Sequence, residues 1–282
     1  MQITVVGSVN LDLVAAGERL PRPGETVTNA VLAQHPGGKG ANQALAARRL
    51  GAEVVLLAAV GRDANADAAL ALLRAEGVRL EHCIVDPLLP TGVALIAVAA
   101  SGENQIVVAP GANRALGSTF VLPPSDAVVC QLEVPVAAVE RAASQCQGLL
   151  VLNLAPAAEV PPALLQRADL VIVNQTEAQF YGAGLRTRRG LLAVTAGAAG
   201  AILWRDGQEI ARVTPPAITA VDTTGAGDAF VAALTVALLE GQAADGALRF
   251  ACAAGAACAL RAGAQPALPT RAQVLALLAA GR

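Results

Sequence analysis

Lysine and aromatic residues are scarce in this chain of 282 residues. Lys39 is the only lysine among 20 basic residues, and one tryptophan, one tyrosine and four phenylalanines make up 2% of the sequence. No aromatic residue precedes Phe120, so we do not expect a base-stacking pocket in the N-terminal part of the chain. With a formal net charge of −2 and no basic block, the composition argues against nucleic acid or an anionic membrane surface as a partner.

Cysteine and histidine are also too few for a structural metal site. The five cysteines form no Cys-x-x-Cys pair, and His35 and His82 are the only histidines. This argues against structural zinc and predicts a reduced, cytoplasmic setting. The chain opens as a strand without the basic segment of a secretory signal. The apolar run over 250–260 is too short to cross a bilayer and predicts a buried helix.

Strand-like and helix-like segments alternate along most of the chain, in which 55% of residues are hydrophobic. This order predicts an α/β fold with a mainly parallel central sheet and helices on both faces, as a single domain over 1–282. The expected strands are 3–6, 54–60, 127–132, 149–154, 170–174, 191–195 and the hairpin 201–205 with 208–213, and a strand-like approach covers 218–221. The expected helices are 40–50, 66–76, 135–145, 162–166 and 229–240.

Two stretches interrupt this alternation and predict a separate small β-sheet. Residues 11–34 hold two prolines and a glycine between extended runs, and residues 91–110 form a hairpin pattern around Ser101-Gly102. We expect both to leave the main sheet and form a lid, over roughly 11–36 and 91–110. Val93, Leu95 and Ala97 alternate along it, and because exposed strand edges are usually covered, we expect two lids to pair in a homodimer. A monomer whose lid folds on itself is the alternative.

The segment Asp222-Thr223-Thr224-Gly225-Ala226-Gly227-Asp228 joins the strand-like residues 218–221 to the predicted helix 229–240. The free N–H groups of Gly225 to Asp228 are expected at a helix N-terminus, which attracts anions through unpaired donors and the helix dipole. Asp228 is then interpreted as a general base beside a phosphoryl group. Taken alone, the segment slightly favours the alternative in which Asp228 is an ordinary helix N-cap.

Polar residues follow five predicted strands, at what would be one edge of the sheet. Ligands of open parallel sheets bind beyond the carboxyl ends of the strands. The residues concerned are Asn10 and Asp12, Glu133, Asn174 and Glu177, Thr195 and Gly197, and Asp222 to Asp228.

A second glycine-rich loop, Gly37-Gly38-Lys39-Gly40-Ala41-Asn42-Gln43, contains the lone lysine. In a chain that otherwise uses arginine, it indicates a requirement for a compact ammonium group; the alternative is chance. The loop is not a phosphate-binding GxxxxGK[ST] motif, and the chain has no GxGxxG.

These segments together resemble the ribokinase, or PfkB, family of sugar kinases. The resemblance extends over the whole chain, and the Gly-Ala-Gly-Asp turn is specific to the superfamily. The matching residues are Gly7-Ser8-Val9-Asn10-Leu11-Asp12, Pro23-Gly24-Glu25-Thr26, Gly37 to Gln43, Thr91-Gly92-Val93-Ala94, Pro110-Gly111-Ala112-Asn113, Gln131-Leu132-Glu133, Asn174-Gln175-Thr176-Glu177, Asp222 to Asp228 and Gly263-Ala264-Gln265-Pro266.

The resemblance implies an ATP-dependent kinase that phosphorylates the primary 5-hydroxyl of D-ribose. Asp228 would be the base, and the N–H groups of Gly225, Ala226 and Gly227 would form the anion hole. The residues implied to bind sugar are Asn10, Leu11, Asp12, Gly38, Lys39, Gly40, Ala41, Asn42, Glu133 and Asp228. Those implied at the nucleotide are Asn174, Thr195, Gly197, Gly200, Gly227 and Cys252, although for Cys252 the sequence favours a small buried residue.

The resemblance further implies two kinds of metal ion. Glu177 would hold Mg²⁺ through water. A monovalent cation, K⁺, would lie at Asp222, Thr224, Cys258, Arg261 and Gly263, mostly on backbone carbonyls; the Arg261 side chain is equally explained as a charge at a helix C-terminus. Ala267 stands where the family commonly has serine, and the connection over 175–194 is shorter than in the family.

Three alternatives to ribose phosphorylation stay open. A sugar phosphate would require more basic residues than Lys39, so a neutral pentose fits best, followed by deoxyribose or a ketohexose. A nucleoside kinase is disfavoured by the lack of aromatic residues. A catalytically silent sugar-binding regulator is disfavoured by the presence of Asp228, the glycine turn and Glu177.

Overall fold

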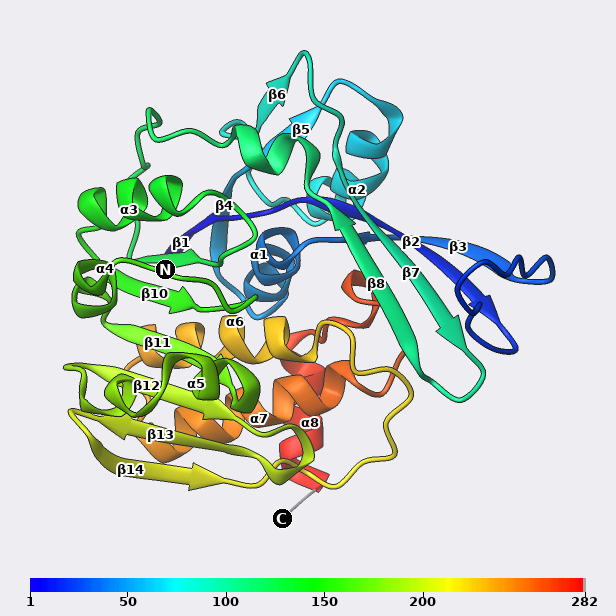
Figure 1. Ribbon diagram of the computed structural model, residues 1–282. Coiled ribbons are helices and arrows are strands. Elements are labelled where there is room, and N and C mark those ends of the chain that lie inside the picture. Colours follow the sequence, from blue (N-terminus) through cyan, green and yellow to red (C-terminus); the bar gives the residue numbers. More distant parts are fainter. Residues whose placement is uncertain (281–282) are drawn as a thin grey trace.

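The computed structural model describes residues 1–280 and contains a large, mostly parallel sheet (Figure 1). Its strand order is β14-β13-β12-β11-β10-β9-β1-β4, in which only β13 and β14 pair antiparallel to their neighbours. The strands are β1 (Gln2–Val6), β4 (Glu53–Leu57), β9 (Ala127–Cys130), β10 (Leu149–Asn153), β11 (Leu170–Asn174), β12 (Leu191–Thr195), β13 (Ala201–Arg205) and β14 (Gln208–Val213).

Helices cover both faces of this sheet, because its parallel strands are apolar on both sides. Val5 and Val129 belong to one buried cluster, whereas their neighbours Val6 and Val128 belong to the other. The first cluster includes residues of α1 (Lys39–Arg49), α2 (Ala64–Ala75), α6 (Ala226–Leu239), α7 (Ala244–Cys258) and α8 (Arg271–Ala280). The second includes residues of α3 (Val136–Gln145) and α4 (Pro162–Arg167), and Ala178 and Tyr181 of α5 (Gln175–Tyr181) pack against it.

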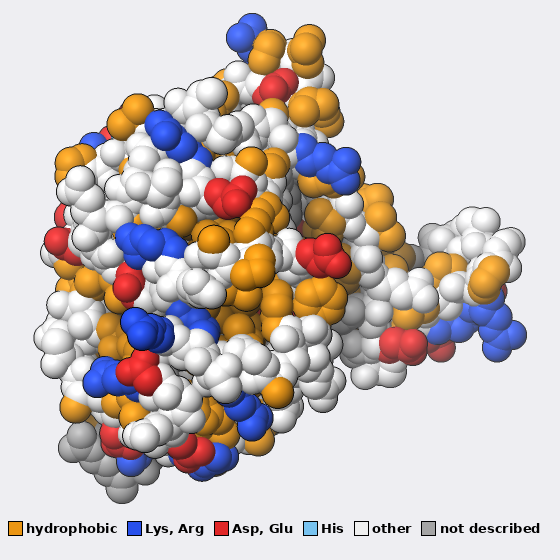
Figure 2. Space-filling view, turned by 60° about the vertical axis from the view of Figure 1, so that its left-hand side comes forward, with side chains coloured by type: hydrophobic (Ala, Val, Ile, Leu, Met, Phe, Trp, Pro, Cys, Tyr) orange, Lys and Arg blue, Asp and Glu red, His pale blue; other side chains and the backbone are white. Residues whose placement is uncertain are grey.

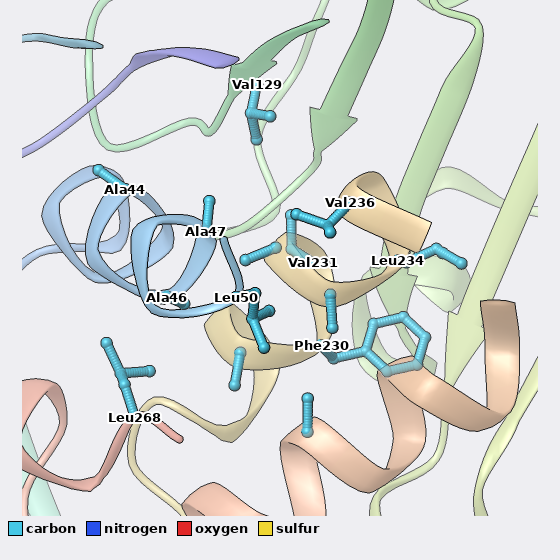
Figure 3. Close-up of a cluster of buried hydrophobic side chains, with 14 of the residues drawn as sticks. Ala44, Ala46, Ala47, Leu50, Val129, Phe230, Val231, Leu234, Val236 and Leu268 are labelled. Carbon is cyan, nitrogen blue, oxygen red and sulfur yellow. The ribbon is translucent and has the colours of Figure 1, made fainter. Parts of the chain in front are cut away.

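Small side chains allow α1 and α6 to pack closely under the sheet. Figure 3 shows the two helices side by side, with Ala47 of α1 and Leu50, which follows α1, near Val231 of α6. Helix α6 is buried along most of its length, from Asp228 to Ala237. Both helices begin at glycine-rich loops, so this packing brings the two loops of the sequence together.

The predicted small sheet is present and projects from the body of the molecule (Figures 1 and 2). Its strand order is β3-β2-β7-β8, from β2 (Asn10–Gly17), β3 (Val31–Gly37), β7 (Gly92–Ala99) and β8 (Asn104–Ala109). Apolar side chains are exposed on its two outer strands, including Val31, Leu32, Ile106 and Val107. A further pair, β5 (Ala59–Gly61) with β6 (Ile84–Asp86), lies beside it.

The predicted fold class is confirmed, with two local differences. The expected strand 54–60 is broken after Leu57, and its end belongs to β5. The strand expected over 218–221 is wrong: these residues form no strand, and Ile218 and Ala220 line a cavity beside the start of α6. The connection over 175–194 holds α5, of 7 residues, and a 3-10 turn at Ala183–Thr187 before β12 begins at Leu191. Within the described range, no helix is long and apolar enough to cross a membrane.

The close helix packing predicts a strong dependence on alanine size. Ala233 in α6 is fully buried, so Ala233→Leu forces extra methyl groups into a filled core. We expect a loss of about 1–3 kcal/mol in the free energy of unfolding, measured by denaturant titration. Ala71→Leu, at an exposed position of α2, is the matched control and should change stability little. Equal effects of the two substitutions would contradict tight packing at Ala233.

Candidate active site

Asp228 lies where the first turn of α6 meets the start of α1. The N-cap of α6 is Gly225, and Asp228 is the third residue of the helix. Its carboxylate accepts hydrogen bonds from Asn42 Nδ2 at 2.9 Å and from Gln43 Nε2 at 2.9 Å, both on α1. Asp228 is therefore not the N-cap of its own helix, and the capping alternative is wrong.

Asp228 is only 7% exposed, which is unusual for a residue that must be ionised to act as a base. Burial raises the pKa of Asp228 above its ordinary value. The charge of Lys39 and the bonds from Asn42 and Gln43 act in the opposite direction and favour the carboxylate form. The site thus combines desolvation, which makes a carboxylate more basic, with donors that keep it ionised.

Three carboxylates and one ammonium group define the side of the site predicted to bind sugar. Burial, together with the charges of Glu133 and Asp228, raises the pKa of Asp12 to about 6. Burial also tends to lower the pKa of Lys39, but the charges of Asp228, Glu133 and Glu177 outweigh it, so the pKa is raised. Lys39 is therefore held as a cation among acidic groups, which suits a donor to sugar hydroxyls.

The start of α1 is tied to neighbouring loops by its own N–H groups. Lys39 N donates to Glu133 Oε2 at 3.0 Å, Gly40 N donates to Ser8 Oγ at 3.3 Å, and Ala41 N donates to Ser8 O at 2.9 Å. Gly40 and Ala41 are predicted to bind the sugar, but in this structure their N–H groups anchor the loop to Ser8. Leu11, the other apolar residue in the predicted set, is a buried residue of β2 between Asn10 and Asp12.

Asn113 is a site residue whose role the sequence did not reveal. Its Nδ2 donates to Asn10 Oδ1 at 2.8 Å and to Val9 O at 3.1 Å, and its Oδ1 accepts from Val9 N at 2.9 Å. Asn113 therefore orients Asn10. The signal was available, because Asn113 belongs to a segment that matches the family, but its partner is about a hundred residues away.

A cavity of about 510 Å³ opens beside the start of α6, and it gathers most of the residues predicted at the nucleotide. Its walls are mainly apolar residues and glycines, with Phe230 among them. Of the predicted set it includes Thr195, Gly197, Gly200, Gly227 and Cys252. Asn174 does not line it: this residue caps α5, where Asn174 Oδ1 accepts from Glu177 N at 2.8 Å and Asn174 N donates to Glu177 Oε2 at 2.7 Å.

The turn before Asp228 requires a glycine at position 225, because its backbone has a positive φ and its surroundings leave little room for a side chain. Gly225 has a φ of 80°, and a Cβ there would lie 3.3 Å from Ala264 Cα and 3.5 Å from Cys258 Sγ. Ala226 N already donates to Thr223 O at 3.2 Å. Among the described residues, no backbone acceptor is found for the N–H of Gly225 or Gly227, so these two are better placed than Ala226 to meet an anion.

Comparison with known proteins assigns this arrangement to a family. Residues 1–271 match the model described as pfkB family carbohydrate kinase. The chain belongs to the pfkB family. It is 36% identical to a ribokinase of Haemophilus influenzae, with 98% of each chain covered, and 38% identical to a ribokinase of Bacillus subtilis, with 98% of this chain and 99% of that chain covered. It superimposes with a TM-score of 0.88, at 30% identity, on Arabidopsis thaliana ribokinase complexed with ribose and ATP, with 98% of each chain covered.

The residues predicted to bind a monovalent cation form a compact group next to the glycine turn. Asp222 Oδ1 accepts from Thr224 N at 2.9 Å, and Asp222 Oδ2 accepts from Gly263 N at 2.8 Å. Cys258 Sγ donates to Thr224 O at 3.5 Å, and Arg261 N donates to Cys258 O at 3.3 Å. The predicted residues are thus neighbours, while the Arg261 side chain is exposed.

The raised pKa of Asp12 predicts that this pfkB site reduces stability at neutral pH. A carboxyl whose folded pKa exceeds its unfolded value contributes stability at low pH, and this is lost as the pH rises from about 4 through 6. Asp12→Asn should therefore raise the free energy of unfolding by about 1–3 kcal/mol above pH 6 and by little near pH 4. The exposed Glu140→Gln in α3 is the control. A gain from Asp12→Asn that does not vary with pH would contradict this account.

Proposed function

We propose that this protein is an ATP-dependent sugar kinase that phosphorylates the primary 5-hydroxyl of D-ribose to give ribose 5-phosphate. The observation that carries the proposal is the position of Asp228. Its buried carboxylate interacts electrostatically with Asp12, Lys39 and Glu133 on the side predicted to bind sugar. The preceding residue, Gly227, lines the cavity on the side predicted to bind the nucleotide. A base between a sugar site and a nucleotide site is what phosphoryl transfer from ATP to a hydroxyl requires.

In this proposal, Asp228 accepts the proton of the sugar 5-hydroxyl as the sugar oxygen attacks the γ-phosphorus of ATP. The bond between the γ-phosphorus and the bridging oxygen breaks, and ADP leaves. The N–H groups of Gly225 and Gly227, at the positive end of the 14-residue helix α6, stabilise charge on the transferred group. Asn10, Asp12, Lys39, Asn42 and Glu133 hold the sugar hydroxyls.

Two metal ions belong to the proposal. Glu177 fits Mg²⁺, since only its Oε2 is used in the cap of α5, and no group of three or more His, Cys, Asp or Glu residues within 1–280 forms an all-protein metal site. A single carboxylate with water and phosphate oxygens is typical of Mg²⁺. K⁺ would lie among Asp222, Thr224, Cys258, Arg261 and Gly263. When bound, Mg²⁺ offsets phosphate charge, and K⁺ raises the positive potential at the turn.

The relatives named ribokinase favour ribose over the other candidate substrates. Deoxyribose, a ketohexose or a nucleoside would enter the same site, and a silent regulator would keep the sugar site alone. The retained Asp228 and glycine turn favour an enzyme over a regulator.

Measurement of ADP release with ribose, deoxyribose, fructose and adenosine tests the proposal. With Mg²⁺ present we expect ribose to give the highest kcat/KM, and K⁺ to increase it. Asp228→Asn should lower kcat by about 10²–10⁴-fold while ribose still binds, because only the base is lost. Full turnover by this variant would exclude Asp228 as the base, and no stimulation by any sugar would exclude the kinase.

We further propose that the chain works as one kinase domain in the cytoplasm, as a homodimer formed through the small sheet. The exposed apolar residues of β3 and β8 support pairing of two lids. Val107→Asp on β8 should convert a dimer to a monomer in analytical ultracentrifugation. Val121→Asp, also at an exposed apolar position but outside the sheet, is the control. A wild-type protein that sediments as a monomer at micromolar concentration would contradict the dimer.

A further inference from the structure

Gln43 is more buried than Asp228, the base it contacts, and than Asn10 and Asn42, which are predicted to bind the sugar. It is 1% exposed and lies on α1, where its Nε2 donates to Asp228 Oδ1 at 2.9 Å. We propose that Gln43 is a positioning residue for Asp228, held in one orientation by the buried amide of Asn153. This inference rests on the proposed role of Asp228 as the base.

The orientation of the Gln43 amide follows from a fixed point in the backbone. The carbonyl of Ile172 can only accept, and it accepts from Asn153 Nδ2 at 3.2 Å. Asn153 therefore presents its Oδ1 to Gln43, whose Nε2 donates to it at 3.0 Å. The other end of the same amide, Gln43 Oε1, accepts from Gln131 Nε2 at 2.6 Å. We call Asn153, Gln43 and Gln131 the amide relay.

The relay presents Asp228 with a donor and not with an acceptor. If the Gln43 amide were turned over, its oxygen would face both Asn153 Oδ1 and the Asp228 carboxylate. Each of these two contacts leaves a buried polar group unsatisfied, which is costly. Gln131 does not oppose this change, because its own Oε1 is buried without a partner in the described structure and could accept from Gln43 Nε2 instead. The direction set at Ile172 therefore favours the ionised form of Asp228.

The hydrogen bonds made by the side-chain amides of Gln43 and Asn42 show which of the two is free to contact the substrate. Both protons of Gln43 Nε2 are used, by Asp228 and Asn153, and its oxygen is used by Gln131. Asn42 also donates to Asp228, but its Oδ1 is buried without a partner in the described structure, so it remains available to a sugar hydroxyl. Gln43 should consequently affect the base, whereas Asn42 should affect both the base and the sugar.

The space for Gln131 is provided by a glycine of the first loop. A Cβ at Gly7 would lie 2.0 Å from Gln131 Oε1 and 2.7 Å from Gly40 Cα, so no larger residue fits there. The relay thus connects α1 with the ends of β9 and β10, and together with the close approach of Gly40 it accounts for the glycine at position 7.

The pH dependence of turnover is the appropriate readout, because it reports the protonation of the base in the enzyme–substrate complex. The other ionisable groups that act on Asp228 are Lys39 on α1, Glu133 after β9, Asp12 on β2 and Cys258 on α7. These groups are unchanged in the variants below, so a difference between the profiles reports the relay.

Two substitutions of Gln43 distinguish positioning from packing. Gln43→Met keeps the length of the side chain and removes the donor; we expect kcat for ribose at pH 7 to fall by about 10–100-fold. The acid limb of the kcat profile should move up by about one pH unit, with KM for ribose nearly unchanged. The glutamate in Gln43→Glu has nearly the same shape as glutamine but places a second carboxylate beside Asp228. It should therefore move the acid limb of the kcat profile to a still higher pH. A packing role predicts the reverse order, with Gln43→Glu closest to the native protein.

Gln131→Met provides a second, milder test in case the Gln43 variants do not fold. It removes the hydrogen bond to Gln43 Oε1 but none of the hydrogen bonds to Asp228. The acid limb of the kcat profile should therefore move in the same direction as in Gln43→Met, but by less. The double variant with Gln43→Met should be no worse than Gln43→Met alone, because both act through one amide. An unchanged acid limb in both single variants would overturn the inference, while loss of turnover in Asp228→Asn would still support the proposed function. Full turnover in Asp228→Asn would instead overturn the proposed function.

Discussion

The site depends on keeping one carboxylate ionised where water is almost excluded. A buried Asp228 without partners would take up a proton and could no longer act as a base. The protein meets this constraint with one cation, Lys39, and with two amide donors from α1. The close packing of α1 against α6 serves the same purpose, because it brings these donors to the first turn of α6. Substitutions that separate the two helices should therefore affect catalysis as well as stability.

Much of this arrangement could be predicted from the sequence, because it depends on patterns that are local in the chain. Strand–helix alternation predicts the parallel sheet, and glycines next to Lys39 and Asp228 mark the two helix starts. The strand expected over 218–221 failed because four suitable residues do not make a strand without a neighbour to pair with. Residues 218 and 220 instead line the cavity beside α6.

The amide relay could not be predicted, since glutamine and asparagine look alike in a sequence whether they are exposed or buried. Asn153 ends a strand, as Asn174 does, yet Asn153 is buried against Gln43 whereas Asn174 caps a surface helix. Only the three-dimensional structure shows which atoms remain for a ligand. The same holds for Ala226, whose N–H is used within the turn although its neighbours are similar in sequence.

The group of carboxylates around Lys39 has a consequence for the end of the catalytic cycle. Asp12, Glu133 and Asp228 suit a neutral sugar, because its hydroxyls donate to them. Once the sugar carries a phosphate dianion, Asp228 has taken up the proton, but the carboxylates of Asp12 and Glu133 repel the product, and one ammonium group cannot offset both. We expect the product to be expelled more readily than the substrate dissociates. Salt would weaken this repulsion, so product inhibition by the sugar phosphate should become stronger as ionic strength rises.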